Sequence, residues 1–126
     1  MRTGFRQLWI VLMLPFFAAS VEAALDWESA LAGAHRDPKN AARDEFRHPR
    51  QTLEFFGLEE DMTVVELYPG GGWYTEVLAP LLAPAGSYYA AHLSPNGGPY
   101  ARRSLGRYLQ KLGADDDVYG GVTVTT

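Results

Sequence analysis

The chain of 126 residues has the length of one domain, and its 47% hydrophobic and 13% aromatic residues exclude a mainly disordered protein. Its formal net charge of −4 argues against non-specific nucleic-acid binding, which needs a basic surface, so we expect no nucleic-acid partner. The lack of cysteine excludes a disulfide scaffold, a cysteine-ligated metal centre and a thiol nucleophile.

Residues 1–23 have the three parts of a secretory signal peptide. Two arginines precede an apolar run over residues 8–21, and small residues occupy the −3 and −1 positions of a cut after Ala23. The run is shorter than the roughly 20 residues of a membrane-spanning helix, although a retained anchor is the alternative. We therefore expect export to the periplasm or the medium, a mature chain beginning at Ala24, and no stable membrane insertion after cleavage.

Residues 24–57 are expected to form an N-terminal helical segment. Apolar residues recur at helical spacing over residues 25–34, a short helix is expected near Asn40, and Pro49 marks the start of a helix that ends at Gly57. Basic side chains of this segment could form a lid over a ligand or contact a substrate, but a solvated segment with local ion pairs is the favoured interpretation. These side chains are His35, Arg36, Arg47, His48 and Arg50. The histidines of the chain lack ligand-like spacing, so no metal site is predicted.

From residue 58 onward, strands and helices alternate. The expected strands are residues 63–67, 87–92 and 122–125, and the expected helices are residues 73–82 and 100–112, the first ending or kinking near Pro80. Such alternation favours right-handed βαβ units with parallel strands. The predicted fold class is therefore α/β.

The most informative stretch is the glycine-rich loop YPGGG, residues 68–72, between a predicted strand and a predicted helix. Glycine lets backbone amides approach a ligand closely, and ligands of open parallel sheets lie beyond the carboxyl ends of strands. The loop is not a dinucleotide fingerprint, because Thr75 stands where the third glycine belongs, and no P-loop sequence follows. Ligand binding is favoured over a glycine-rich connection without a ligand, because three consecutive glycines cost backbone entropy on folding.

The sequence ELYPGGGW, residues 66–73, resembles motif I of class I S-adenosylmethionine-dependent methyltransferases. Glu66 matches the acidic residue of that motif, and Gly70 and Gly72 match its second and third glycines, whereas Tyr68 occupies the place of the first. Residues 32–58 and 62–82 together also resemble a group of exported bacterial proteins described as predicted methyltransferases.

The resemblance implies a Rossmann-like three-layer parallel sheet, of which residues 58–126 would be the N-terminal half with the first three strands only. It implies S-adenosylmethionine as cofactor, with the glycine loop and the acidic residue at its methionine portion and the end of the second strand at its ribose. His92 ends that strand in place of the usual acidic residue, so a satisfied strand-end histidine is the alternative there. The candidate cofactor-binding residues are Glu66, Tyr68, Gly70, Gly71, Gly72 and His92.

The function implied is therefore methyl transfer to an unknown acceptor. No catalytic residue can be assigned from the sequence, because the sulfonium is already a strong electrophile and the protein mainly orients the reactants. The segment alone is expected to be inactive. The alternative from a different class is a non-catalytic nucleoside-binding or interaction module, a degenerate or truncated relative of the enzymes.

Overall fold

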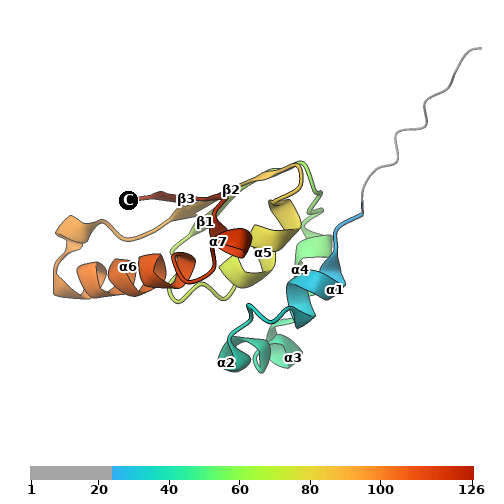
Figure 1. Cartoon of the computed structure of the whole chain (residues 1–126), viewed down its shortest axis with the longest axis horizontal. Helices are drawn as coiled ribbons and strands as arrows, with labels where there is room; N and C mark the ends of the chain where they lie inside the picture. Colours follow the sequence, from blue (N-terminus) through green and yellow to red (C-terminus); the bar gives the residue numbers. More distant parts are fainter. Residues whose placement is uncertain (1–23) are drawn as a thin grey trace, which may run out of the picture.

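The computed structural model describes residues 24–126, and the predicted signal peptide lies outside them. Four short helices come first, and strands then alternate with helices (Figure 1). The elements are α1 (Trp27–Ala32), α2 (Pro38–Ala41), α3 (Asp44–Arg47), α4 (Pro49–Phe55), β1 (Thr63–Leu67), α5 (Thr75–Leu82), β2 (Ser87–Ala91), the 3-10 helix η1 (Pro95–Gly97), α6 (Pro99–Leu112), α7 (Asp116–Tyr119) and β3 (Val122–Thr125).

The three strands form one parallel sheet in the order β1-β2-β3. In its register Val65 pairs with Tyr89, which pairs in turn with Thr123. Parallel strands need a crossover connection, and α5 and α6 provide the two crossovers. The predicted α/β class with a parallel sheet is confirmed.

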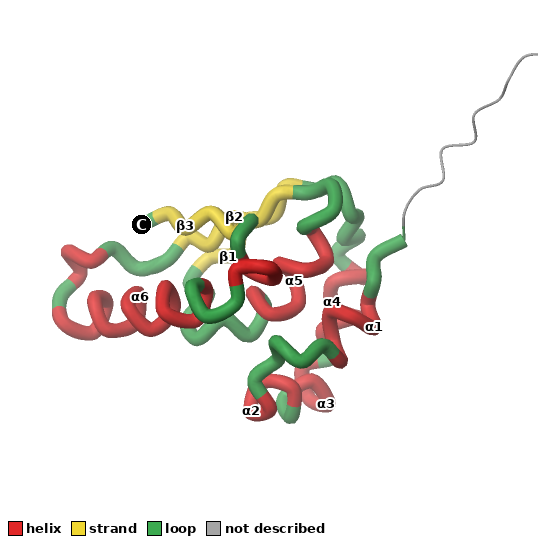
Figure 2. Tube along the Cα trace, viewed as in Figure 1, coloured by secondary structure: helices red, strands yellow, loops and turns green. Residues whose placement is uncertain are grey.

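The helices α5, α6 and α7 lie on one face of the sheet (Figures 1 and 2). Val64, Tyr88 and Ala90 point from the strands into the core beneath these helices. On the opposite face, the side chains of Val65 and Leu67 are 56% and 72% exposed. Two right-handed crossovers that advance in the same direction place their helices on the same side, so the described residues form two layers.

The helix α5 continues through Pro80 and ends at Leu82, although proline was expected to end or kink it. Proline has no N–H group, so the carbonyl oxygen of Glu76 four residues earlier lacks its usual helical donor. The side chain of His35 replaces that donor, with its Nε2 2.8 Å from the Glu76 carbonyl oxygen. Since a carbonyl only accepts, the His35 ring carries its proton on Nε2.

The N-terminal helices pack against α5. Ala30 of α1 is fully buried against Val77 and Leu81 of α5. In Figure 1, α2 and α3 lie together at the end of α5 that follows the glycine loop. This placement brings the segment from residue 35 to residue 47 next to the carboxyl end of β1.

Candidate functional site

An open hollow of about 250 Å³ lies at the carboxyl end of β1. It contains four of the six predicted cofactor-binding residues, namely Glu66, Tyr68, Gly70 and Gly71. The complete lining is Asn40, Arg43, Arg47, Glu66, Tyr68, Pro69, Gly70, Gly71, Trp73 and Tyr74. Sites for whole small molecules usually measure about 300–1,000 Å³, so this hollow matches part of a cofactor-sized ligand.

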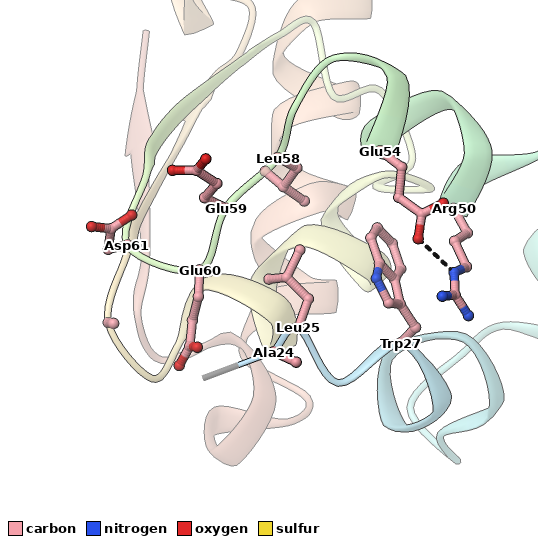
Figure 3. Close-up of a pocket in the computed structure, with 10 residues that line it drawn as sticks. Ala24, Leu25, Trp27, Arg50, Glu54, Leu58, Glu59, Glu60 and Asp61 are labelled. Atoms are coloured by element: carbon pink, nitrogen blue, oxygen red, sulfur yellow. Dashed lines mark hydrogen bonds and ion pairs between the residues drawn. The ribbon is translucent and has the colours of Figure 1, made fainter. Parts of the chain in front are cut away.

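A larger hollow of about 760 Å³ lies at the other end of the strands (Figure 3). Trp27, Arg50 and Leu58 line it together with Glu59, Glu60 and Asp61. Arg50 is paired there with Glu54 at 2.8 Å. This larger hollow contains none of the glycine loop and faces the amino ends of the strands, so the smaller hollow is the candidate site.

The loop backbone has left-handed conformations at Tyr68, Gly70 and Gly72, with φ of 56°, 59° and 80°. A tyrosine in this region is uncommon, and such strain often occurs at functional sites. The amide of Tyr68 donates to the carbonyl of Ala91 at 2.9 Å, so the strand pairing continues into the loop. The loop is therefore held in a defined shape by the neighbouring strand.

The glycines of the loop face different surroundings. A Cβ atom on Gly71 would meet no atom within 4 Å, whereas one on Gly72 would lie 3.1 Å from Lys111 Cδ and 3.3 Å from Tyr108 Cε2. Gly72, one of the predicted cofactor-binding residues, is buried against α6 and does not line the hollow, and its role in binding stays a prediction. Its missing side chain makes room for Lys111 and Tyr108, whereas Gly70 and Gly71 line the hollow.

Glu66 connects the hollow to a buried polar network. Its Oε2 accepts from the hydroxyl of Tyr88 and from Thr75 Oγ1, the latter at 3.3 Å. Thr75 Oγ1 also lies 2.9 Å from the hydroxyl of Tyr108. Within residues 24–126, Glu66 Oε1 has no hydrogen-bond partner, so one carboxylate oxygen stays available to a ligand.

The environment of Glu66 changes its acidity. Burial raises the pKa of the carboxyl above its usual range, while the hydrogen bonds from Tyr88 and Thr75 and the charge of Arg47 act in the opposite direction. Burial and the nearby Glu66 carboxylate raise the pKa of Tyr88, which therefore remains a donor at neutral pH. The Tyr88 hydroxyl therefore continues to donate to Glu66 Oε2 and holds that oxygen in the buried network.

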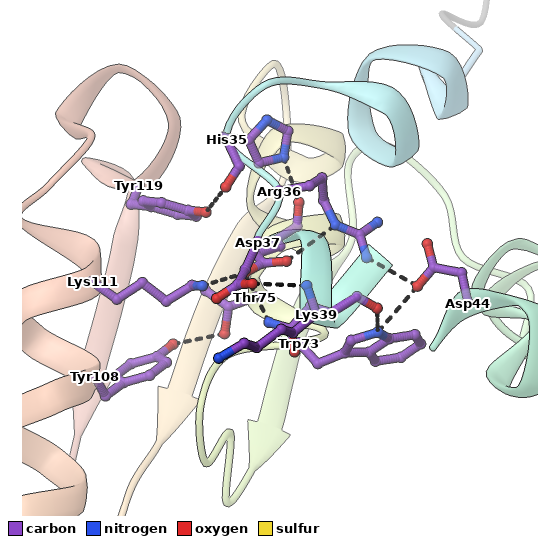
Figure 4. A network of polar contacts seen from close by, with 12 residues as sticks. His35, Arg36, Asp37, Lys39, Asp44, Trp73, Thr75, Tyr108, Lys111 and Tyr119 are labelled. Carbon is purple, nitrogen blue, oxygen red and sulfur yellow. Dashed lines mark hydrogen bonds and ion pairs between the residues drawn. The ribbon is translucent and has the colours of Figure 1, made fainter. Parts of the chain in front are cut away.

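A second polar cluster surrounds the fully buried side chain of Glu76 (Figure 4). Arg36 Nε lies 3.1 Å from Glu76 Oε2, Asn40 Nδ2 lies 2.9 Å from Oε1, and Lys111 Nζ also pairs with Oε1. Arg36 extends the cluster to Asp44 at 3.0 Å. The interpretation of Arg36 as part of a solvated segment is therefore wrong, because its side chain is buried. This burial results from tertiary packing and has no local signal in the sequence.

Trp73 joins the glycine loop to the N-terminal helices. Its indole Nε1 donates to the carbonyl of Asn40 at 2.9 Å and to Asp44 Oδ1 at 3.1 Å. The guanidinium carbon of Arg47 lies 4.1 Å from the centre of a Trp73 ring and 5.5 Å from that of Tyr74. These contacts hold α2 and α3 beside the hollow.

Five residues of the hollow were not identified from the sequence as site residues: Asn40, Arg43, Pro69, Trp73 and Tyr74. The only local signal for Arg43 is that it lies four residues before Arg47, because residues at this spacing lie on the same side of a helix. The contact of that side with the glycine loop depends on tertiary packing. Arg47, by contrast, was considered in the sequence as a possible lid residue, and it does line the hollow.

His92 lies apart from the hollow. It is buried beside Tyr108, with ring centres 5.2 Å apart, and its Nδ1 accepts from the amide of Leu93 at 2.7 Å. Its Nε2 is buried without a hydrogen-bond partner within residues 24–126. The ribose contact assigned to His92 stays a prediction.

Within residues 24–126, no group of three or more His, Asp or Glu side chains is arranged to hold a metal ion. No helix in this range has the length and apolar character to cross a membrane. Protein-family models give no match to the chain, and comparisons with curated proteins and with solved structures give no significant match. The function must therefore be inferred from the residues themselves.

Proposed function

We propose that the chain is the N-terminal part of an exported S-adenosylmethionine-dependent methyltransferase. Its complete domain would be a Rossmann-like three-layer sheet, and the methyl acceptor is unknown. The observation that carries the proposal is Glu66 near the end of a parallel strand, where it lines a hollow together with Gly70 and Gly71 and has one carboxylate oxygen without a hydrogen-bond partner within residues 24–126. The parallel order β1-β2-β3 is also that of the first half of a doubly wound sheet.

The residues of the hollow fit the methionine portion of the cofactor. Glu66 would bind its ammonium group through Oε1, a charge-assisted hydrogen bond. The space beside Gly71, which a larger side chain would occupy, lets the backbone approach the ligand. When bound, the cofactor supplies an electrophilic methyl group, and the chain's own residues orient it and limit access of water.

A non-catalytic nucleoside-binding or interaction module is the second candidate. Two observations favour it: His92 does not line the hollow, and the hollow is smaller than a typical whole-ligand site. Predicted export also separates the protein from the cytoplasm, where the cofactor is made. Such a module would bind adenosine as well as it binds S-adenosylmethionine.

Calorimetry on the full-length gene product separates the two candidates. We expect S-adenosylmethionine and S-adenosylhomocysteine to bind, and Glu66→Ala to weaken both about ten- to hundredfold while adenosine binding scarcely changes. Adenosine lacks the ammonium group, so it tests whether Glu66 acts on the methionine portion. Absence of binding by both cofactor forms would refute the enzyme, and equal losses for all three ligands would refute the orientation.

A further inference from the structure

Two arginines of the hollow have no acceptor for their side-chain N–H groups. Arg43 and Arg47 both line it, and within residues 24–126 neither guanidinium donates a hydrogen bond or forms an ion pair. Two acidic residues lie between them in the sequence: Asp44 is occupied by Arg36 and by the indole of Trp73, and Glu45 is exposed and forms no ion pair within residues 24–126. The donors of Arg43 and Arg47 are therefore available to a ligand.

The position of Arg47 is set by its neighbours. The guanidinium carbon lies over the Trp73 ring, 4.1 Å from its centre, and 5.5 Å from that of Tyr74, and these contacts hold the Arg47 side chain beside the hollow. Trp73 is in turn held by Asn40 and Asp44, which belong to the segment anchored on Glu76. Arg47 is thus presented by a fixed part of the protein, and Arg43 lies one helical turn before it, although both side chains are exposed.

The charges of the hollow are unbalanced. Its only acidic residue is Glu66, against Arg43 and Arg47, and the pKa of the Glu66 carboxyl is raised by burial. If Glu66 binds the ammonium of a cofactor, the lining of the hollow offers no further carboxylate to balance the two guanidinium groups. A cationic acceptor would be repelled there, whereas a carboxylate or phosphate matches the planar donor fork of arginine.

We propose that Arg43 and Arg47 form an oxyanion subsite that binds a carboxylate or phosphate group of the methyl acceptor. This inference rests on the proposed function, because it specifies the substrate class of the same site. The cofactor itself carries a carboxylate, which is the other possible source of such an anion. The experiment must therefore measure the affinity of the acceptor-like anion separately from that of the cofactor.

The test is a titration of the full-length protein with benzoate, phenyl phosphate and the neutral benzamide, each with and without S-adenosylhomocysteine. The indole N–H signal of Trp73 in nuclear magnetic resonance spectra reports binding, because this ring lies against Arg47. We expect at least one of the two anions to bind about tenfold more tightly than benzamide in the presence of S-adenosylhomocysteine.

Variants identify the residues responsible. Arg43→Gln and Arg47→Gln should each remove most of the preference for the anion. Arg47→Lys should retain only part of the preference, because lysine keeps the positive charge but lacks the paired N–H donors of the guanidinium group. Arg103→Gln on α6, an exposed arginine outside the hollow, should leave the preference unchanged. Thermal denaturation of each variant verifies folding, and the exposed Arg43 provides a test even if Arg47→Gln unfolds.

The outcomes separate the two proposals. Equal affinity for benzamide and both anions overturns the oxyanion subsite even if S-adenosylhomocysteine binds. A loss of S-adenosylhomocysteine affinity as large as the loss for the anion, with 5′-methylthioadenosine unaffected, also overturns it, because the arginines then bind the cofactor's own carboxylate. Anion preference without any cofactor binding supports an anion site at Arg43 and Arg47 but refutes the methyltransferase, and with it the assignment of the anion to a methyl acceptor.

Discussion

Arg36 and Glu76 form a buried ion pair between segments 40 residues apart, with Arg36 Nε 3.1 Å from Glu76 Oε2. One partner precedes the short helices α2 and α3, where Arg43 caps α3 and Arg47 ends it, and the other lies in the first turn of α5, after the glycine loop. The pair therefore fixes the distance between the two halves of the candidate site. Removing one partner of such a pair leaves the other charge buried without compensation.

The first prediction concerns the stability of this cluster. Glu76→Gln should lower the free energy of unfolding by about 3–5 kcal/mol, because Arg36 and Lys111 lose their common carboxylate in a buried setting. Urea denaturation followed by circular dichroism measures the change. Glu54→Gln is the matched control, since the exposed pair of Glu54 with Arg50 should contribute less than about 0.5 kcal/mol. Equal losses for the two variants would contradict the prediction.

The second prediction separates the two glycines of the loop. Gly72→Ala should destabilise the protein by about 1–2 kcal/mol, because φ is 80° and the new Cβ would press on Lys111 and Tyr108. Gly71→Ala should change stability by less than about 1 kcal/mol, because its Cβ meets open space. Thermal denaturation measures both.

The same pair of variants tests the proposed cofactor site. Gly71→Ala should weaken S-adenosylmethionine about tenfold or more while the protein stays folded, since the methyl group occupies space assigned to the ligand. Calorimetry provides the affinity. Unchanged affinity in a folded Gly71→Ala protein would place the ligand elsewhere.

The third prediction is a pH dependence caused by Glu66. Burial raises the pKa of its carboxyl above the ordinary value of 4.5, so the folded state binds the proton more tightly than the unfolded chain. The contribution of this group to the free energy of unfolding therefore falls as pH rises from about 4.5 through the folded pKa, and it is constant above that. Relative to Glu66→Gln, the natural protein should lose stability over this interval, which urea denaturation between pH 4 and 8 measures. A constant difference between the two proteins would contradict the raised pKa.

The fourth prediction concerns the hydrogen bond that compensates for Pro80. His35→Phe keeps a ring beside Tyr119 but leaves the Glu76 carbonyl without a donor, which should cost about 1–3 kcal/mol. In a Pro80→Ala background the restored amide can donate to that carbonyl, so the same change should cost about 1 kcal/mol less. A double-mutant cycle in urea measures the coupling, and purely additive effects would show that His35 does not compensate for the proline.

The fifth prediction concerns export. Residues 1–23 have the pattern of a cleavable signal peptide, so protein isolated from its host should begin at Ala24. Intact-mass spectrometry checks the N-terminus, and Ala23→Arg is the companion variant because signal cleavage needs a small residue before the cut. An unprocessed Met1 on protein recovered from the cytoplasm would refute the prediction.

The strands were predictable because their signals are local. Residues 63–67 and 122–125 were expected as strands and are β1 and β3, and the expected strand at residues 87–92 ends one residue earlier, at Ala91. Runs of β-branched and aromatic residues bounded by turn residues determine such elements within a few positions. The glycine loop was equally visible, because few other residues adopt its backbone angles.

The tertiary structure decided what each of these elements faces. Gly72 has the same local sequence as Gly71, and only its packing against α6 distinguishes the two. Arg36 lies in a polar stretch of sequence that is typical of a solvated segment, yet its side chain is buried in the folded protein. Likewise, nothing near Pro80 in the sequence indicates that His35 supplies its missing donor.

The sequence by itself therefore determined the order and type of the elements and the loop that marks the candidate site. The reason is that backbone geometry and hydrophobic periodicity act between near neighbours in the chain. Burial and ion pairing depend instead on which distant segments meet, and this is decided by how the two crossovers pack on one face of the sheet. The contacts of Glu76, Trp73 and Arg47 across the hollow could be identified only from that packing.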